Sequence, residues 1–406
     1  MQIQDNLMDP SVISDPYTYF AEIRTNDPVH WSDDFGGWIV TRYEDVAFAF
    51  QDQTRFSAER VTPSRKASEK KKKELASTYN VLSHWMVFND PPKHTRLRLL
   101  VNKAFTPSAV EKIKPRIVEI SNELLDEMAN NEKADIIKDY AYALPILVIS
   151  EMLGLPKNDR DKIKKWSDDL MLLVFGAVDV PDRHEKAQKS LQEMYDYLHD
   201  IASKRRENPQ DDLISAIAFA GDGGDKLTTD EIISTCSLLV FGGHETTTNL
   251  IANGMMSLLT HPQAYKELKD NPSLISSAVE EFLRYEGPSK AMIRIAKEDL
   301  ELGGKKIKQN ERLLLVQASA NRDPAKFTKP DKLDITRHPN QHLGFGRGIH
   351  YCLGAPLARV EGEIAIKQLI QRFPQMTLED VQIEWQPTII NRALKRLPVT
   401  LRGTSS

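Results

Sequence analysis

Cysteine is scarce in this 406-residue sequence, which has only Cys236 and Cys352. Two cysteines so far apart in the chain exclude a disulfide framework and a cysteine-rich metal site, so we expect a reducing, cytoplasmic environment. Long apolar runs are also missing. The longest, Leu144–Ile149 and Cys236–Phe241, are far shorter than the ~18 residues that a membrane span needs. Met1–Asn6 lacks the basic and apolar regions of a signal peptide. We therefore expect no membrane span.

A large excess of either charge is absent as well. The 54 Lys and Arg residues nearly balance the 58 Asp and Glu residues, and the net charge of −4 excludes the strongly basic balance of a nucleic-acid binder. With 40% hydrophobic and 28% charged residues the chain can form a core, so disorder is excluded as its main state. One basic segment, 65–74, is expected to be a solvated loop or an exposed helical turn.

No internal repeat and no Gly/Ser-rich or Pro-rich linker divides the sequence, which favours a single domain over residues 1–406. Helical periodicity dominates, as in residues 113–128, where apolar residues recur at steps of three and four. Strand signals are few: Trp38–Thr41, and a hairpin-like pair formed by Leu300–Leu302 and Arg312–Gln317 around a Gly-Gly dipeptide. The sequence therefore predicts a mainly α fold with a minor β part (α+β).

The most informative predicted helix begins at Thr228 and stops before His261. Thr228 and Glu231 have the spacing of a capping box, and the residues are apolar or small nearly all round, which suits a helix that crosses the interior and lines a cavity. In its middle, Gly242–Thr248 is poor helix-forming material. Its glycines either let a ligand approach the backbone or mark a packing kink. A carboxylate, Glu245, in so apolar a helix needs a partner or a task.

A second informative segment is Phe345–Gly354, in which three glycines frame Cys352 just before a predicted helix at Ala355–Arg372. The glycines let the backbone fold tightly and let a flat ligand approach closely. A helix N-terminus stabilises a thiolate over a thiol, as a metal-ligating cysteine requires. Without such a context, a lone cysteine is usually an inert buried thiol.

This segment resembles the haem-binding segment of the cytochromes P450, whose pattern is Phe-x-x-Gly-x-x-x-Cys-x-Gly. The fixed positions are filled by Phe345, Gly348, Cys352 and Gly354, and an optional one by His350. This agreement would arise by chance with odds on the order of 10⁻⁴. The resemblance implies the cytochrome P450 fold, with the long central helix over a haem b group and the Cys352 thiolate as axial ligand. Gly346 is a further expected haem contact.

The resemblance extends along most of the chain. The central helix matches the family's Ala/Gly-Gly-x-Asp/Glu-Thr segment at Gly242, Gly243, Glu245 and Thr246. Glu281 and Arg284 resemble its Glu-x-x-Arg pair, and a spacing of three places both charges on one helix face, as a structural ion pair requires. Basic side chains are expected to bind the haem propionates. By position these are His94, Arg98, Arg294 and His350.

The resemblance further implies a haem-thiolate monooxygenase, which activates O2 with two externally supplied electrons and hydroxylates or epoxidises a hydrophobic small molecule. Glu245 and Thr246 would be its catalytic residues and would deliver protons. The expected electron donor is a ferredoxin or flavodoxin with an NAD(P)H-dependent reductase, docked where Lys103, Arg347 and Arg359 present positive charge. A monomer is expected.

The expected substrate is a steroid, terpenoid, fatty acid or polyketide in an apolar pocket above the haem. By resemblance, the pocket walls are Met86, Val87, Phe88, Leu172, Phe175, Leu239, Val240, Gly243, Ala291, Met292, Ile293, Ile389 and Ile390. Lys290 and Asn391 are polar residues that could meet a carboxylate, hydroxyl or lactone.

Two other functions are compatible with the same sequence features. A haem-thiolate isomerase or peroxygenase would share Cys352 but would not require Glu245 and Thr246. A non-catalytic haem-thiolate binding or sensing protein would form no product that depends on NAD(P)H and a redox partner.

Overall fold

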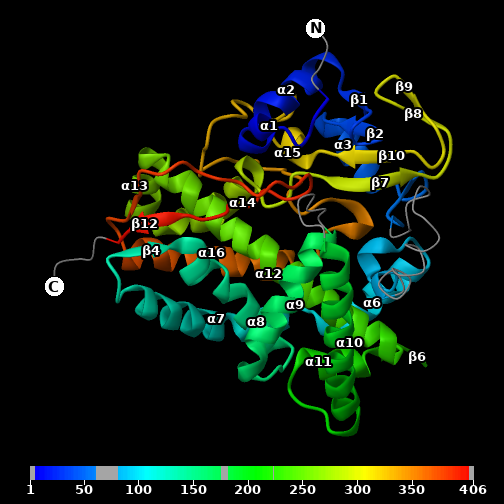
Figure 1. Cartoon of the computed structure of the whole chain (residues 1–406), viewed down its shortest axis with the longest axis vertical. Coiled ribbons are helices and arrows are strands. Elements are labelled where there is room, and N and C mark those ends of the chain that lie inside the picture. The colour runs from blue at the N-terminus through cyan, green and yellow to red at the C-terminus, as the bar shows by residue number, and fades with distance from the viewer. Residues whose placement is uncertain (1–4, 61–80, 175–181, 223, 402–406) are drawn as a thin grey trace.

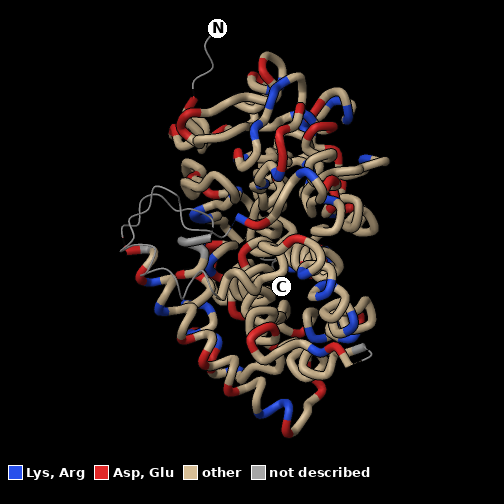
Figure 2. The backbone as a smooth tube through the Cα atoms, turned by 90° about the vertical axis from the view of Figure 1, so that its right-hand side faces the viewer, with Lys and Arg blue, Asp and Glu red and all other residues tan. Residues whose placement is uncertain are grey.

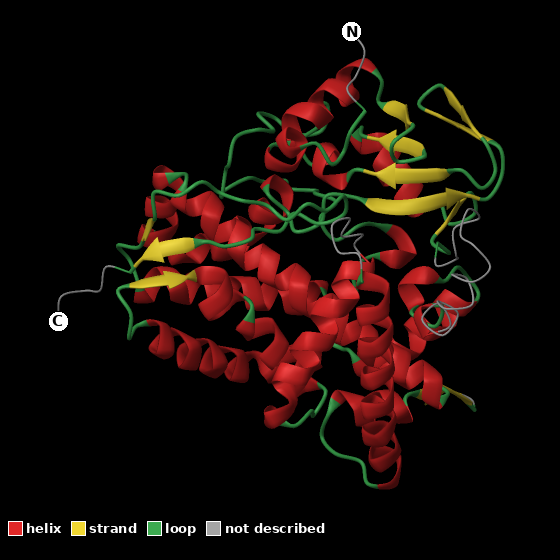
Figure 3. Ribbon diagram, in the orientation of Figure 1, coloured by secondary structure: helices red, strands yellow, loops and turns green. Residues whose placement is uncertain are grey.

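The computed structural model describes residues 5–60, 81–174, 182–222 and 224–401, and the basic segment 65–74 lies outside them. Helices form most of the chain, and the strands gather mainly at one end of the molecule (Figure 3). This arrangement confirms the predicted mainly α fold with a minor β part.

The α-helices are α1 (Pro10–Ser14), α2 (Pro16–Asn26), α3 (Tyr43–Gln51), α6 (Lys93–Ala104), α7 (Pro107–Met128), α8 (Ala143–Met152), α9 (Arg160–Val174), α10 (Arg183–Glu207), α11 (Leu213–Phe219), α12 (Thr229–Leu259), α13 (Pro262–Asp270), α14 (Ile275–Tyr285), α15 (Gln317–Ala320) and α16 (Ala355–Arg372). Short 3-10 or π turns are η1 (Met86–Phe88), η2 (Ile137–Ala141), η3 (Lys157–Asp159), η4 (Pro272–Leu274) and η5 (Gly348–His350).

The strands are β1 (Val29–Ser32), β2 (Gly37–Val40), β3 (Phe56–Ser57), β4 (Lys133–Asp135), β5 (Gly221–Asp222), β6 (Asp225–Lys226), β7 (Met292–Ala296), β8 (Leu300–Leu302), β9 (Lys305–Ile307), β10 (Arg312–Leu315), β11 (Thr377–Leu378) and β12 (Pro398–Thr400). The largest sheet has the order β1-β2-β10-β7-β3. In it, β2 pairs antiparallel with β1 and parallel with β10, and β10 pairs antiparallel with β7, where Leu313 lies opposite Arg294. The predicted strand at 38–41 corresponds to β2.

The hairpin expected from Leu300–Leu302 and Arg312–Gln317 was wrong. β8 pairs instead with β9, at Leu302 opposite Lys305. Gly303 and Gly304 form the two-residue connection with φ of 55° and 77°, and a turn with two positive φ values joins neighbouring antiparallel strands directly. Because this short turn closes the hairpin locally, β10 is left to pair with β2 and β7 in the larger sheet.

Helix α12 runs through the middle of the molecule and is buried over most of its length (Figure 1). It packs against α8, α10 and α16. Thr228 caps it, and Thr228 and Glu231 form the predicted capping box. The helix continues through Gly242 and Gly243 without a break, because burial of a helix by its neighbours outweighs weak intrinsic propensity.

Figure 2 shows basic and acidic residues interspersed along the described backbone, in keeping with the balanced composition. Among the described helices, none is both long and apolar enough to cross a membrane.

Candidate functional site

Cys352 is held at the N-terminal end of α16 by a tight loop. Gly346 and Gly348 have φ of 69° and 73°, in the left-handed region that favours glycine. A Cβ at Gly348 would lie 2.7 Å from the carbonyl oxygen of Phe50, so a larger residue does not fit there. The Cys352 N–H donates to the Phe345 carbonyl at 3.0 Å and closes the loop. The glycines singled out in the sequence therefore fix the position of the thiol.

Opposing influences act on the Cys352 thiol. Burial raises its pKa, whereas the backbone N–H groups of Gly354 and Ala355 donate to the sulfur and lower the pKa, as do the charges of Arg98 and Arg359. These donors and charges favour the thiolate. A metal cation bound to the sulfur would favour the thiolate further, so the site suits a cysteine that ligates a metal.

The predicted propionate residues come together beside this loop. The rings of His94 on α6 and His350 on η5 lie with their centroids 4.1 Å apart. The charges of Arg98 and Arg294 act on both histidines. Burial and then these charges lower the pKa of His94 to about 4. The structure therefore gathers four groups from three distant segments of the chain into one cationic cluster.

The sequence interpretation missed a fifth member of this cluster, Arg60. Its charge acts on His350, and burial, followed by the charges of Arg294 and Arg312, lowers its own pKa to about 9. The family pattern around Cys352 carries no signal for it, because Arg60 lies almost 300 residues upstream and follows only a two-residue strand, β3.

The cluster lacks carboxylate ion pairs within the described part of the chain. Arg294 donates only to the neighbouring Ile293 carbonyl, at 3.0 Å, and the buried Nδ1 of His94 has no hydrogen-bond partner among the described residues. Burying cations is costly unless anions join them. The cluster is therefore suited to an anionic ligand with more than one carboxylate.

The glycines of both segments leave room for such a ligand. A Cβ added at Gly242, Gly346 or Gly354 would meet no atom within 4 Å. Gly242 is exposed although it lies in the middle of the otherwise buried α12. Open space beside these glycines, a thiol on one side and a cationic cluster at the edge fit a haem, which is flat, takes a thiolate on its iron and carries two propionates.

Glu245 and Thr246 lie at the centre of α12, close to the exposed Gly242. The Thr246 hydroxyl donates to the Gly242 carbonyl at 2.7 Å. The Asn249 amide donates to Glu245 at 3.2 Å. Burial, aided by the charge of Asp168 and opposed by the hydrogen bond from Asn249, raises the pKa of Glu245 to about 7. A carboxyl group with this pKa exchanges protons near neutral pH.

Glu281 and Arg284 form the predicted ion pair on α14. Neither side chain is exposed. Arg337 also donates to Glu281, at 3.1 Å, and Arg284 also donates to the carbonyls of Asn321 and Pro330, at 2.9 and 2.7 Å. The pair therefore ties α14 to the irregular segment that leads into the Cys352 loop, and contacts no part of the open space itself.

A sequence model of the family described as Cytochrome P450 matches residues 38–393. The chain is a cytochrome P450.

Similar proteins cover nearly its whole length. The biotin biosynthesis cytochrome P450 of Bacillus subtilis (strain 168) is 39% identical over 98% of this chain and 100% of its own. The vitamin D(3) 25-hydroxylase of Pseudonocardia autotrophica is 38% identical over 99% and 98%. The crystal structure of P450BioI with an acyl carrier protein that carries hexadec-9Z-enoic acid has a TM-score of 0.90, is 37% identical, and covers 97% of this chain and 99% of that one.

These matches show the function at the level of the family. This P450 is a haem-thiolate monooxygenase, which binds haem through a cysteine thiolate and inserts one oxygen atom of O2 into a hydrophobic small molecule. Its electrons come from a redox partner.

The expected pocket residues of this P450 fall into several packed groups. Met86, Phe88, Leu239 and Val240 belong to the main helical core, Met292 packs against the core of the sheet, and Ala291, Ile293, Ile389 and Ile390 pack together at the other side of that sheet. Val87 is exposed, and a Cβ at Gly243 would touch Ile149 at 3.7 Å. Leu172 is on α9, and Phe175 lies outside the described residues.

An aromatic row that the sequence interpretation missed lies within the main helical core. Trp85 stacks on Phe88 with ring centroids 5.9 Å apart and an interplanar angle of 7°, and its centroid lies 5.1 Å from that of Phe241 on α12. The Trp85 indole N–H donates to Ser237 at 2.9 Å. The row therefore fixes η1 against the central helix next to Gly242.

The two polar residues singled out near the pocket are both buried. Lys290 donates to the Thr388 carbonyl, and burial lowers its pKa to about 7. Asn391 lies opposite Ser289 in an isolated β-bridge, and neither polar atom of its amide has a partner among the described residues. Lys290 therefore does not reach the solvent.

The three residues expected at the docking face differ in their contacts. Arg347 is exposed. Lys103 is exposed and donates to the Gly221 carbonyl at 3.2 Å. Arg359 makes two hydrogen bonds with Glu280, at 2.6 and 3.0 Å, so its charge is largely matched.

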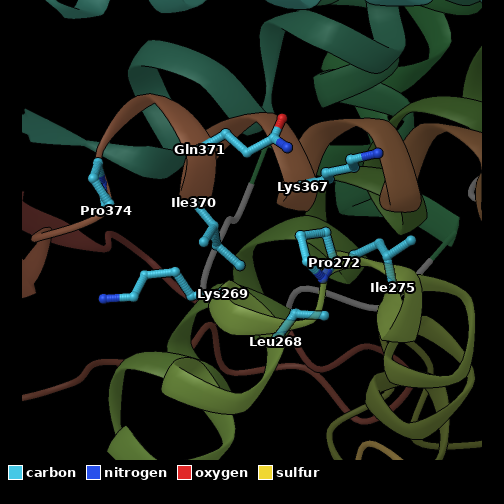
Figure 4. A pocket seen from close by; sticks show the side chains of 8 residues that line it. All are labelled: Leu268, Lys269, Pro272, Ile275, Lys367, Ile370, Gln371 and Pro374. Carbon is cyan, nitrogen blue, oxygen red and sulfur yellow. The ribbon is translucent and has the colours of Figure 1, made fainter.

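A surface groove lies away from this site, between α13, η4 and α16 (Figure 4). Its walls include Leu268, Pro272, Ile275 and Ile370, with Lys269 and Lys367 at the rim. It contains none of the predicted site residues.

Proposed function

We propose that Cys352 is the axial thiolate ligand of haem b and that His94, Arg98, Arg294 and His350 bind its propionates. Phe345, Gly346 and Gly354 would lie against the ring on the thiolate side. One observation carries the proposal: the sulfur of Cys352 receives two backbone N–H groups and lies within range of the charge of Arg98, which belongs to the cationic cluster. Cys236 offers no such setting, because it is buried in the apolar core on α12.

When bound, the haem supplies the iron chemistry that activates O2. The protein's own catalytic groups are Glu245 and Thr246, which handle protons. Glu245 holds a proton near neutral pH because burial raises its pKa to about 7. The hydrogen of the Thr246 hydroxyl is engaged by the Gly242 carbonyl, so the oxygen offers its lone pairs to the open space beside Gly242.

The proton supply to Glu245 would come from the side of α9, where the charge of Asp168 acts on it. Asp168 is exposed and accepts a hydrogen bond from the Tyr142 hydroxyl. The charges of Asp168 and Glu245 act on Tyr142, and that of Asp168 acts on Glu245. Glu245 would therefore be resupplied with protons from this side, as a general acid in repeated turnover requires.

The substrate would be a steroid, terpenoid, fatty acid or polyketide that is hydroxylated or epoxidised. The apolar character of Val87, Ile293 and Ile390 supports a hydrophobic ligand. The electron donor would be a ferredoxin or flavodoxin with an NAD(P)H-dependent reductase. We further propose that residues 1–406 form one haem domain that acts as a monomer in the cytoplasm.

The test of the haem assignment is the absorption difference spectrum of the dithionite-reduced protein with and without carbon monoxide. A strongly red-shifted Soret band is expected for the native chain, and its loss is expected for Cys352→Ser. The matched control is Cys236→Ala, which should keep the band. A native band that survives Cys352→Ser would contradict the ligand assignment. Product formation that requires NAD(P)H and a redox partner distinguishes the monooxygenase from a haem-binding sensor.

A further inference from the structure

Arg60 is a cation without an acidic partner in the part of the chain that the structure describes. Its guanidinium group lies 4.6 Å from the centroid of the Phe88 ring. The charged groups that act on it are Arg294 and Arg312, and both are positive. A partly buried guanidinium that faces only other cations is unfavourable in the free protein, so its position suggests an anionic ligand.

The two haem propionates do not account for all the permanent charge at this site. Haem b carries two carboxylates at its edge, and Arg98 and Arg294 already supply two guanidinium groups. Arg60 adds a third. Arg312 is exposed and stacks on Phe35 at 4.9 Å, so it points to another part of the sheet. The charge of Asp90 also acts on Arg294, but Asp90 is paired with Lys297 at 3.3 Å. One inward positive charge thus remains beyond those that the propionates match.

A row of aromatic side chains connects Arg60 with the central helix α12. Phe88 holds the guanidinium on one side and stacks on Trp85. Trp85 in turn contacts Phe241, the neighbour of Gly242. Val87, next to Phe88, and Gly242 are both exposed. An amphipathic ligand with its apolar part beside Val87 and Gly242 would reach Arg60 with its polar end.

We propose that Arg60 binds the carboxylate of the substrate, which is a carboxylic acid with a long apolar body. The inference rests on the proposed function, because it deepens the nature of the hydrophobic substrate. Guanidinium groups bind carboxylates through two parallel hydrogen bonds, and Phe88 keeps the group in place by a cation–π contact. Arg60 then selects acids over neutral molecules with the same apolar body.

The experiment compares acids with the primary alcohols of equal chain length. Purified haem-loaded protein is titrated with octanoic, dodecanoic and hexadecanoic acids and with octanol, dodecanol and hexadecanol, and binding is followed by the shift of the Soret band. At one or more lengths the native protein should bind the acid more tightly than the alcohol. Arg60→Gln should weaken binding of the acid by about 30-fold or more. It should change the affinity for the alcohol by less than about threefold.

Two further variants keep the outcome decisive. Arg60→Lys keeps the charge but loses the fork geometry, so it should keep part of the preference for acids. Arg312→Gln removes a neighbouring exposed cation and should leave the preference unchanged. Native protein with no preference for the acid at any length would overturn the proposal. So would haem-loaded Arg60→Gln protein that keeps the native preference for the acid, because Arg60 would then not bind the carboxylate. The carbon monoxide spectrum is recorded on each sample, and absence of its band in native protein would instead contradict the proposed function.

Discussion

Arg284 lies one turn after Glu281 on α14 and donates two hydrogen bonds of 2.8 Å to its carboxylate, with neither side chain exposed to solvent. Further side chains and backbone groups complete the hydrogen bonding of the pair, among them the side chains of Arg337 and Asn340, which donate to Glu281. Arg284 also donates to the carbonyls of Asn321, Pro330 and Lys332, and Glu281 also accepts from the Asp334 N–H at 2.9 Å. The segment that precedes the Cys352 loop has an irregular backbone. The Glu281–Arg284 pair therefore holds this segment in place through side-chain hydrogen bonds.

Removing one partner of this pair should unfold the segment it holds. Arg284→Ala removes the guanidinium group that donates twice to the buried Glu281 and leaves the Asn321 and Pro330 carbonyls without their side-chain donor, which costs about 3–5 kcal/mol. Arg284→Lys should not restore stability, because an ammonium group cannot reach all these acceptors. Thermal unfolding and haem content of the purified variants check this. Arg372→Ala breaks an exposed ion pair with Asp126 and serves as the control, with an expected loss below about 1 kcal/mol. Equal losses for Arg284→Ala and Arg372→Ala would refute the structural role.

Thr246→Ala should separate electron consumption from product formation. The variant removes the hydroxyl beside the open space at Gly242, so we expect haem and substrate binding to persist while reducing equivalents are released as hydrogen peroxide. The measurement is the ratio of product to NAD(P)H consumed. Thr248→Ala is the matched control, since Thr248 also donates to the carbonyl four residues earlier, at 3.1 Å, but is buried. Unchanged coupling in Thr246→Ala would remove Thr246 from the catalytic residues.

Glu245 should impose a pH dependence on turnover. Burial raises its pKa to about 7, so its proton-donating form declines as pH rises from 6 to 8. The rate of product formation should fall over the same interval. Glu245→Gln has no carboxyl proton to donate. We expect its rate of product formation to be lower by a factor of about 100 or more and to be independent of pH between 6 and 8. Rates at saturating substrate and redox partner between pH 6 and 8 check the prediction, and a variant that keeps the native pH profile would contradict it.

Glu361 on α16 should make the folded protein less stable as pH rises. Burial raises its pKa well above the usual value, and its Oε2 has no hydrogen-bond partner among the described residues. The folded state therefore binds this proton more tightly than the unfolded state does. Its contribution to stability is greatest below the unfolded pKa of about 4.3 and declines as pH rises above that value.

Glu361→Gln does not titrate, so it should gain stability relative to the native protein as pH increases. Melting temperatures measured from pH 5 to 8 should show the gap widening in favour of the variant. Glu363→Gln, on the same helix but not fully buried, provides the comparison and should show no such trend. A constant gap for Glu361→Gln would mean that Glu361 has the same pKa in both states.

The sequence was most informative where the structure depends on nearby residues. The capping box at Thr228 and Glu231, the loop around Cys352 and the Glu281–Arg284 pair each involve residues within a few positions of one another, and each is present. The hairpin at Leu300 failed for a local reason as well, because a Gly-Gly turn with positive φ values closes on the nearest strand.

The order of residues along the chain thus determined the family and predicted the role of Cys352, since glycine spacing and a cysteine ahead of a helix are properties of one short segment. Only the tertiary structure brought Arg60 beside His350, and Trp85 between Phe88 and Phe241. These contacts join segments separated by many residues. They arise from the packing of whole elements against α12 and the large sheet. No local sequence pattern therefore indicates that the charge of Arg60 has no acidic partner among the described residues.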